Sequence, residues 1–131
     1  MIEFSTEEIE FLLSYEEARL ATCHDNIPHV KPVSYIYHQN TILICTDYET
    51  RSFQNIRENS NTSVVVDLYK PGGHKAICFQ GKSFIIEKGK EFDEIYHLFY
   101  KKFKWVREDP WKEGEAPFLK IIPKNKKSWG I

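Results

Sequence analysis

The chain has 131 residues and a formal net charge of −1, with 41% hydrophobic and 28% charged residues. These values are typical of one globular domain that buries its own core, and the near-zero charge provides no global field to recruit nucleic acid or an anionic membrane. No apolar run approaches the roughly 18 residues of a membrane span, and the acidic N-terminus is unlike a signal peptide. We therefore expect a single cytoplasmic domain, residues 1–131.

The first predicted element is a helix over residues 5–16. Ser5 and Glu8 have the spacing of a capping box, and apolar residues follow at helical spacing. Three strands are expected next, separated by turn residues that allow only antiparallel pairing. These strands cover residues 18–24, 29–38 and 41–46.

The second half of the chain is predicted to alternate between helices and strands. The segment KPGGHK is its clearest loop. The stretch that carries Pro110, Gly114 and Pro117 is expected to be irregular, and PKNKKSWGI is the tail after the last strand. The predicted elements are helices at 52–59 and 90–104 and strands at 61–69, 76–88 and 118–122.

Six mostly consecutive strands, with helices inserted at three points, favour an antiparallel barrel with peripheral helices over a doubly wound sheet. Two residues inside the predicted strands are informative. Pro32 implies an edge or a bulge, and Gly81 implies a bend or a close approach by another segment.

A polar triplet, Thr50-Arg51-Ser52, stands at the start of the helix predicted at 52–59. A helix N-terminus attracts anions, and a guanidinium matches the oxygens of a phosphate monoester. Thr46, at the end of the preceding strand, could add a hydroxyl. A plain N-cap beside a solvated arginine explains the same residues, so the triplet alone leaves both interpretations open.

Short motifs follow one another in a fixed order over about residues 18–68. They are Arg19-Leu20-Ala21-Thr22, Pro28-His29-Val30, Pro32-Val33, Tyr35, Thr46, Arg51 and Asn55-Ile56-Arg57 with Asn59. In this order the set resembles the FMN-binding split barrels related to pyridoxamine-phosphate oxidase. The resemblance implies a mainly β (α+β) fold, a six-stranded antiparallel split β-barrel with peripheral helices.

The resemblance also implies a homodimer with one FMN in each of two clefts between the subunits. The polar triplet would hold the phosphate, one strand's backbone would lie along the isoalloxazine, and a tail aromatic would pack near the ring. The implied cofactor-binding residues are Pro32, Val33, Ser34, Thr46, Thr50, Arg51, Ser52, Gln80 and Trp129. Tyr35 and His29 are further cleft candidates, and no catalytic residue is identified.

Two departures from the family pattern affect this expectation. The usual lysine after the arginine is Ser52 here, which removes one positive charge; Lys31 or Arg57 are candidates to replace it. The tail also lacks the arginine–histidine pairing with which pyridoxamine-phosphate oxidases hold their substrate. We therefore expect a general FMN protein of the family, acting on another small molecule, with a nicotinamide nucleotide as one candidate electron donor.

Three alternatives remain open. One is a deazaflavin coenzyme in the same cleft, and the second is a non-catalytic flavin-binding or sensor protein. The third is a nucleic-acid-binding barrel that uses residues 100–112, where basic and aromatic residues interleave. An amphipathic helix diluted by acidic neighbours explains that segment better, so no nucleic-acid partner is expected.

No metal site is expected from the cysteines or histidines. Cys23, Cys45 and Cys78 lie in apolar, strand-like runs without CxxC spacing, which indicates reduced, buried thiols. The five histidines show no ligand spacing.

Overall fold

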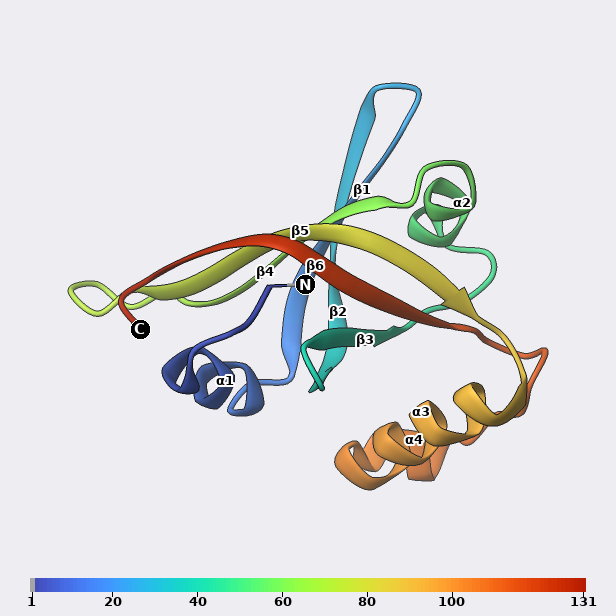
Figure 1. Ribbon diagram of the computed structural model, residues 1–131. Coiled ribbons are helices and arrows are strands. Elements are labelled where there is room, and N and C mark those ends of the chain that lie inside the picture. Colours follow the sequence, from blue (N-terminus) through green and yellow to red (C-terminus); the bar gives the residue numbers. More distant parts are fainter. Residues whose placement is uncertain (1) are drawn as a thin grey trace.

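The computed structural model describes residues 2–131 and contains six strands that close into a barrel (Figure 1). The strand order around the barrel is β1-β2-β3-β6-β5-β4, and every neighbouring pair is antiparallel. The predicted six-stranded antiparallel barrel is therefore confirmed. The elements are α1 (Thr6–Leu13), β1 (Glu17–His24), β2 (Ile27–His38), β3 (Thr41–Cys45), α2 (Arg51–Glu58), β4 (Asn61–Leu68), β5 (Lys75–Ile86), α3 (Gly89–Lys102), α4 (Lys104–Glu108) and β6 (Phe118–Trp129).

Two tight turns build the β1–β2–β3 meander. Asp25 and Asn26 have φ values of 52° and 62°, and Gln39 and Asn40 have 49° and 61°. Asn and Asp tolerate this left-handed region, and two such residues in a row match the twist of the flanking strands. The predicted turns are confirmed.

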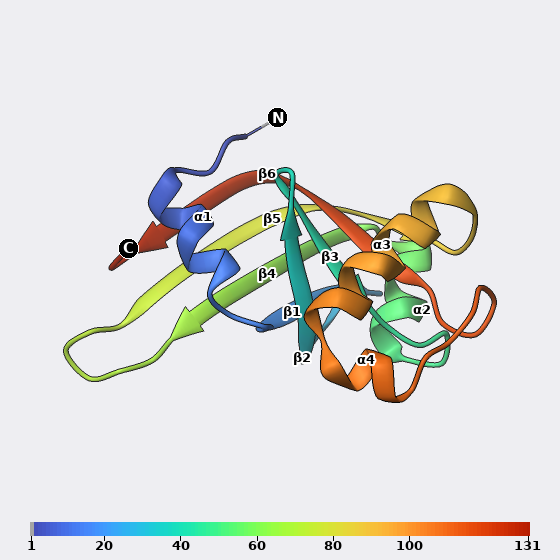
Figure 2. The same cartoon turned by 90° about the horizontal axis from the view of Figure 1, so that it is seen from below.

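The hydrophobic residues divide into two clusters. One fills the barrel, where α1 closes one end with Phe11 and Leu12. The other lies between the outer surface of the barrel and α3 and α4, where Phe99 stacks on Phe118 with ring centroids 5.1 Å apart. Figure 2 shows α1 and the α3–α4 pair at separate places on the barrel. Between residues 2 and 131, no helix is both long and apolar enough to cross a membrane.

Strand β6 continues to Trp129, so the predicted end of the last strand at residue 122 was wrong. The polar residues from Pro123 onward pair with β5 as far as Ala76. They have little intrinsic preference for a strand, and the unpaired edge of β5 imposes the extended conformation. The helix predicted over 90–104 also differs, because the backbone turns extended at Phe103 and divides it into α3 and α4.

Gly81 sits where β6 approaches β5 most closely. The β5–β6 register shifts between Gln80 and Gly81, and a Cβ atom on Gly81 would lie 2.2 Å from the carbonyl oxygen of Ile122. Both features that the sequence predicted for this glycine, a bend and a close approach, are therefore present.

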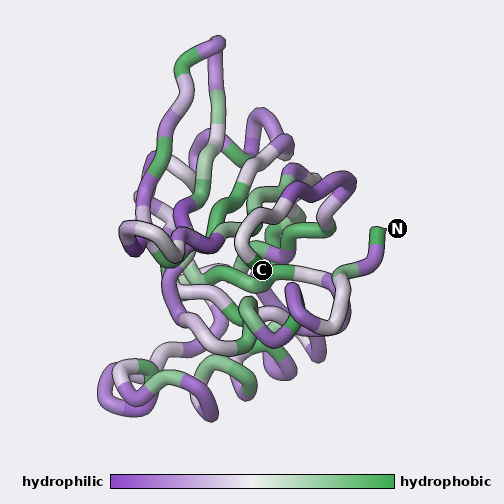
Figure 3. The backbone as a smooth tube through the Cα atoms, turned by 90° about the vertical axis from the view of Figure 1, so that its left-hand side faces the viewer, coloured by the Kyte–Doolittle hydropathy of each residue, from purple (hydrophilic) through white to green (hydrophobic). Residues whose placement is uncertain are grey.

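The β1–β2 hairpin extends beyond the barrel (Figures 1 and 3). Pairing of β2 with β3 begins at Tyr35, so residues 27–34 of β2 have β1 on one side and a free edge on the other. Pro32 lies in this part of the strand, which confirms the predicted edge position.

Candidate functional site

The hydroxyl groups at the start of α2 bond to one another and to the backbone. Thr50 caps the helix, since its Oγ1 accepts the Phe53 N–H at 3.2 Å. The same hydroxyl lies 2.9 Å from Thr46 Oγ1, accepts a bond from Ser52 Oγ at 3.3 Å and donates to the Asp47 carbonyl at 2.9 Å. Ser52 is fully buried. These hydroxyls therefore fix the geometry of the helix start.

Arg51 behaves differently from its two neighbours. It is the first residue of α2 and is exposed, and within residues 2–131 its side chain has no ion pair or hydrogen bond. The guanidinium borders a depression of about 330 Å³. An unpaired arginine at a helix N-terminus is suited to bind an anion. The other residues lining the depression are His24, Asp25, Ile27, Pro28, His29 and Asn55.

The β1–β2 register brings the two histidines to the same face of the hairpin. His29 pairs with Thr22, and His24 follows Thr22 by two residues, so all three side chains point the same way. Asn55 of α2 donates to Thr22 Oγ1 at 3.0 Å and holds the helix against this face. The Nδ1 atom of His29 is buried without a hydrogen-bond partner. His24 and Asn55 were not predicted as site residues, because only the hairpin register and the docking of α2 bring them to Arg51.

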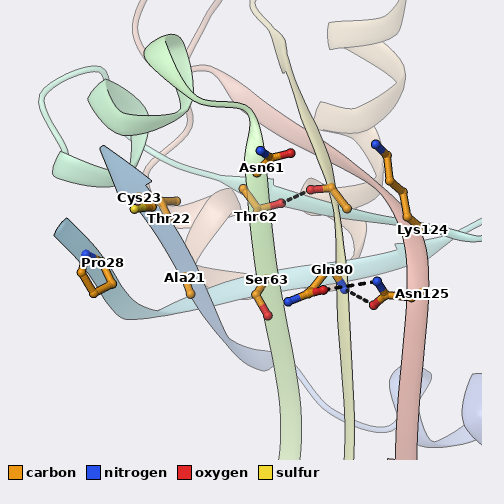
Figure 4. Close-up of a pocket in the computed structure, with 11 residues that line it drawn as sticks. Ala21, Thr22, Cys23, Pro28, Asn61, Thr62, Ser63, Gln80, Lys124 and Asn125 are labelled. Atoms are coloured by element: carbon orange, nitrogen blue, oxygen red, sulfur yellow. Dashed lines mark hydrogen bonds between the residues drawn. The ribbon is translucent and has the colours of Figure 1, made fainter. Parts of the chain in front are cut away.

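A second depression lies next to the first and shares Pro28 with it (Figure 4). Its volume is about 410 Å³, and Gln80 lies on its floor, bonded through its side-chain oxygen to Asn125 Nδ2 at 3.2 Å. Thr62 donates to the Gly81 carbonyl at 3.0 Å. The lining residues come from five strands: Ala21, Thr22 and Cys23 from β1, Pro28 from β2, Asn61, Thr62 and Ser63 from β4, Gln80 and Gly81 from β5, and Lys124 and Asn125 from β6.

Pro32, Val33 and Ser34 border a separate depression of about 380 Å³, which is also lined by Glu16, Glu17, Phe103 and Trp105. The Tyr35 N–H donates to the Glu16 carbonyl at 3.1 Å, toward β1. Because backbone groups alternate along a strand, the Ser34 N–H points to the free edge of β2. Pro32 has no N–H, so Ser34 is the donor of this triplet on that edge.

Tyr35 does not line a cleft, and its assignment as a cleft candidate was wrong. Its side chain is fully buried in the barrel, and its hydroxyl donates to the Leu12 carbonyl at 2.5 Å. Burial raises the pKa of this phenol far above its ordinary value. The alternation of apolar residues in β2 is compatible with either face, and closure of the barrel decides which face is inside.

Trp129 lies far from Arg51 within one chain. It pairs with Ala76, which pairs with Asp67 near the end of β4, whereas α2 precedes the start of β4 at Asn61. Six residues of strand separate the two ends, or about 20 Å, and Figure 1 shows the C-terminus and α2 on opposite sides. The indole contacts His74, with ring centroids 5.9 Å apart.

One of the two basic residues proposed to replace the missing lysine lies near the end of β3. Burial raises the pKa of the Cys45 thiol to about 12, Asp47 adds to this, and the Lys31 ammonium opposes it. Lys31 is therefore close to the end of β3. Arg57 lies in the last turn of α2, where its Nη1 is 3.5 Å from Gln54 Oε1. Among residues 2–131, no group of three or more histidine, cysteine, aspartate or glutamate side chains could hold a metal ion.

Comparisons with known proteins agree with this architecture. Residues 5–129 match the family model described as pyridoxamine 5'-phosphate oxidase, and a search of curated proteins finds no match. Similar solved structures include HutZ, the heme storage protein of Vibrio cholerae (TM-score 0.82, 13% identity, covering 96% of this chain and 94% of HutZ). A conserved hypothetical protein of Mycobacterium tuberculosis has a TM-score of 0.80 at 18% identity, covering 98% of this chain and 86% of its own. An FAD-binding protein of Mesorhizobium loti has a TM-score of 0.76 at 20% identity, covering 95% and 94%.

Proposed function

Because the chain belongs to the pyridoxamine 5'-phosphate oxidase family, we propose that it is an FMN-binding flavoprotein, an oxidoreductase whose cofactor lies in a cleft between two copies of the chain. The observation that carries this proposal is the free guanidinium of Arg51 at the start of α2, facing a depression. A charged group without a partner at a helix N-terminus is suited to a phosphate monoester. We place the protein in the cytoplasm, where its three free cysteines stay reduced.

The remaining residues fit the other parts of FMN. The free edge of β2 offers the Ser34 N–H to the polar edge of a flat ring. The depression around Gln80 combines side-chain amides with the apolar surfaces of Ala21 and Pro28, which is the mixture that orients a large, mostly apolar ligand. FMN, when bound, supplies the capacity to accept and release hydride or electrons. The protein's part is to bind the cofactor, orient it and limit its exposure to water.

A second copy of the chain is proposed because a broad face of the barrel is uncovered. Val30, Ala21, Ser63, Gln80 and Asn125 pair successively across β2, β1, β4, β5 and β6, so they form one row on the outside of the sheet. Val30, Gln80 and Asn125 of this row are exposed. Its small central side chains let another surface approach, and Val30 is 64% exposed. Interfaces between subunits combine apolar and polar side chains in this way.

The dimer would also account for Trp129. Within one chain this indole is about 20 Å along the sheet from the start of α2, so a cofactor at Arg51 could meet only the tryptophan of another copy. A deazaflavin coenzyme is the alternative ligand for the same cleft. Its longer anionic tail favours a site with more cationic groups than Arg51 and Lys31 provide.

The visible absorption spectrum of the purified protein tests the proposal. We expect flavin bands that survive gel filtration, and release of free FMN on denaturation. Anaerobic addition of a nicotinamide nucleotide then tests for an oxidoreductase, because reduction bleaches the bands, whereas a non-catalytic carrier keeps its colour with every donor tried. A colourless protein that takes up neither FMN nor riboflavin would contradict the proposal, and uptake of a deazaflavin alone would favour the alternative.

A further inference from the structure

We infer that the phosphate is bound in the depression between the hairpin tip and α2, where His24 and His29 act together with Arg51 and replace the charge that Ser52 does not supply. This inference rests on the proposed function, since it assigns the phosphate end of the same ligand. It differs from the sequence-based expectation, in which the hydroxyls of the polar triplet contact the phosphate.

The three side chains reach one depression from three elements. His24 ends β1, His29 lies on β2 and Arg51 begins α2, and all three line the same volume of about 330 Å³. The hairpin register aligns the two imidazoles with Thr22, and the bond from Asn55 to Thr22 fixes α2 against them. The donors are thus held in place by the strand pairing and by the docked helix.

The hydroxyl groups near Arg51 already have hydrogen-bond partners within the chain. Thr50 Oγ1 accepts bonds from the Phe53 N–H and Ser52 Oγ, and donates to the Asp47 carbonyl. Ser52 is fully buried. A phosphate could displace these bonds only by uncapping the helix. His29, in contrast, has a buried Nδ1 without a partner, and no side-chain bond commits its ring to a structural role.

The charges facing the depression explain why the imidazoles matter. Its lining contains two groups of fixed charge, Arg51 and Asp25, and two histidines. The formal charges of Arg51 and Asp25 cancel, and Asp25 Oδ2 lies 3.4 Å from His24 Nε2. Each protonated imidazole therefore adds one positive charge, and two of them match a phosphate dianion.

The test compares FMN with riboflavin, which has the same ring and no phosphate. Dissociation constants for FMN and for riboflavin are measured by flavin fluorescence for the wild type and for the His24→Gln/His29→Gln double variant. His97→Gln, at an exposed position on α3, is the matched control.

We expect the double variant to bind FMN about tenfold more weakly, because charge-assisted bonds to a phosphate are the strong ones. Riboflavin binding should be unchanged, and His97→Gln should match the wild type. If the double variant does not fold, His24→Gln alone, on the exposed tip, provides the same comparison.

Two failures are distinguishable. In the first, the wild type binds both FMN and riboflavin, and the histidine variants leave the ratio of the two dissociation constants unchanged. This result overturns the inference and leaves the proposed function standing. A wild type that binds neither flavin overturns the proposed function, and this inference falls with it.

Discussion

Thr50 and Arg51 are neighbours in the chain but have different surroundings in the structure. The Thr50 hydroxyl is engaged in capping α2, while the Arg51 guanidinium has no partner among residues 2–131. The two interpretations that the sequence left open, a helix cap and an anion site, therefore apply to adjacent residues. Neither excludes the other, because the cap holds the backbone that carries the arginine.

Arg51→Ala tests the anion site at the residue scale. We expect FMN binding to weaken by about 1.5–3 kcal/mol, the range for a lost hydrogen bond to a charged group, with little change in stability because the side chain is exposed. The dissociation constant for FMN, measured by fluorescence titration, checks this. Arg57→Ala is the control, since it removes the same charge from the other end of α2. Equal losses in both variants would mean that only the net charge of the helix matters.

At the scale of elements, one buried carboxylate fastens α1 to β6. Glu8 is 6% exposed; its side chain accepts bonds from the Ser5 N–H at 2.8 Å, from Ser128 Oγ at 2.8 Å and from the Lys126 ammonium. Burial by itself would raise the pKa of Glu8, but the bonds from Lys126, Ser5 and Ser128 outweigh it, and the pKa lies below the ordinary value of 4.5. The ionised form is therefore favoured by folding.

Glu8→Gln is expected to change how stability depends on pH. A carboxyl group with a lowered pKa in the folded state contributes stability above pH 4.5, and this contribution is lost as the pH falls through the folded-state value. The variant should unfold more easily by about 1–3 kcal/mol at pH 7, and the difference should shrink below pH 4.5. Urea unfolding between pH 3 and pH 7 measures it. Glu7 is exposed in the same turn, so the stability of Glu7→Gln should follow that of the wild type at every pH. If the stability difference between Glu8→Gln and the wild type is the same from pH 3 to pH 7, ionisation of Glu8 is not linked to folding.

The contact between β5 and β6 depends on the absence of a side chain at residue 81. A Cβ atom there would lie 2.2 Å from a backbone oxygen of Ile122, which cannot move without disturbing the strand pair. Gly81→Ala should therefore lower the free energy of unfolding by about 1–3 kcal/mol, visible as a lower Tm. Gly73→Ala is the control, because its nearest neighbour is a flexible lysine atom at 3.9 Å. Similar Tm values for both variants would show that the strands separate easily at the bulge.

At the scale of the whole molecule, the uncovered sheet face is the feature that predicts assembly. Val30 lies on this face and is 64% exposed, while Leu13 on α1 is 59% exposed elsewhere. Val30→Glu places a charge in the proposed interface, so we expect a dimeric wild type and a monomeric variant with a similar Tm. Leu13→Glu should stay dimeric. Analytical ultracentrifugation distinguishes these outcomes, and a monomeric wild type would remove the dimer from the proposal.

Assembly and cofactor binding are expected to be linked in this protein. If the cleft needs a second copy, Val30→Glu should lose FMN together with its dimer, although Val30 is not among the residues around Arg51. Retention of FMN by a monomeric Val30→Glu variant would show that one chain forms the whole site.

The sequence by itself determined the features that depend on neighbouring residues: the capping box of Ser5 and Glu8, the turns at Asp25-Asn26 and Gln39-Asn40, and the edge position of Pro32. It also determined the antiparallel pairing of the first three strands, because their short connections permit no other arrangement. The tertiary structure decided what depends on contacts between distant segments. It extended β6 to Trp129, turned Tyr35 into the core and brought His24 and His29 to Arg51. Local preferences cannot specify these positions, because strand pairing and barrel closure set them.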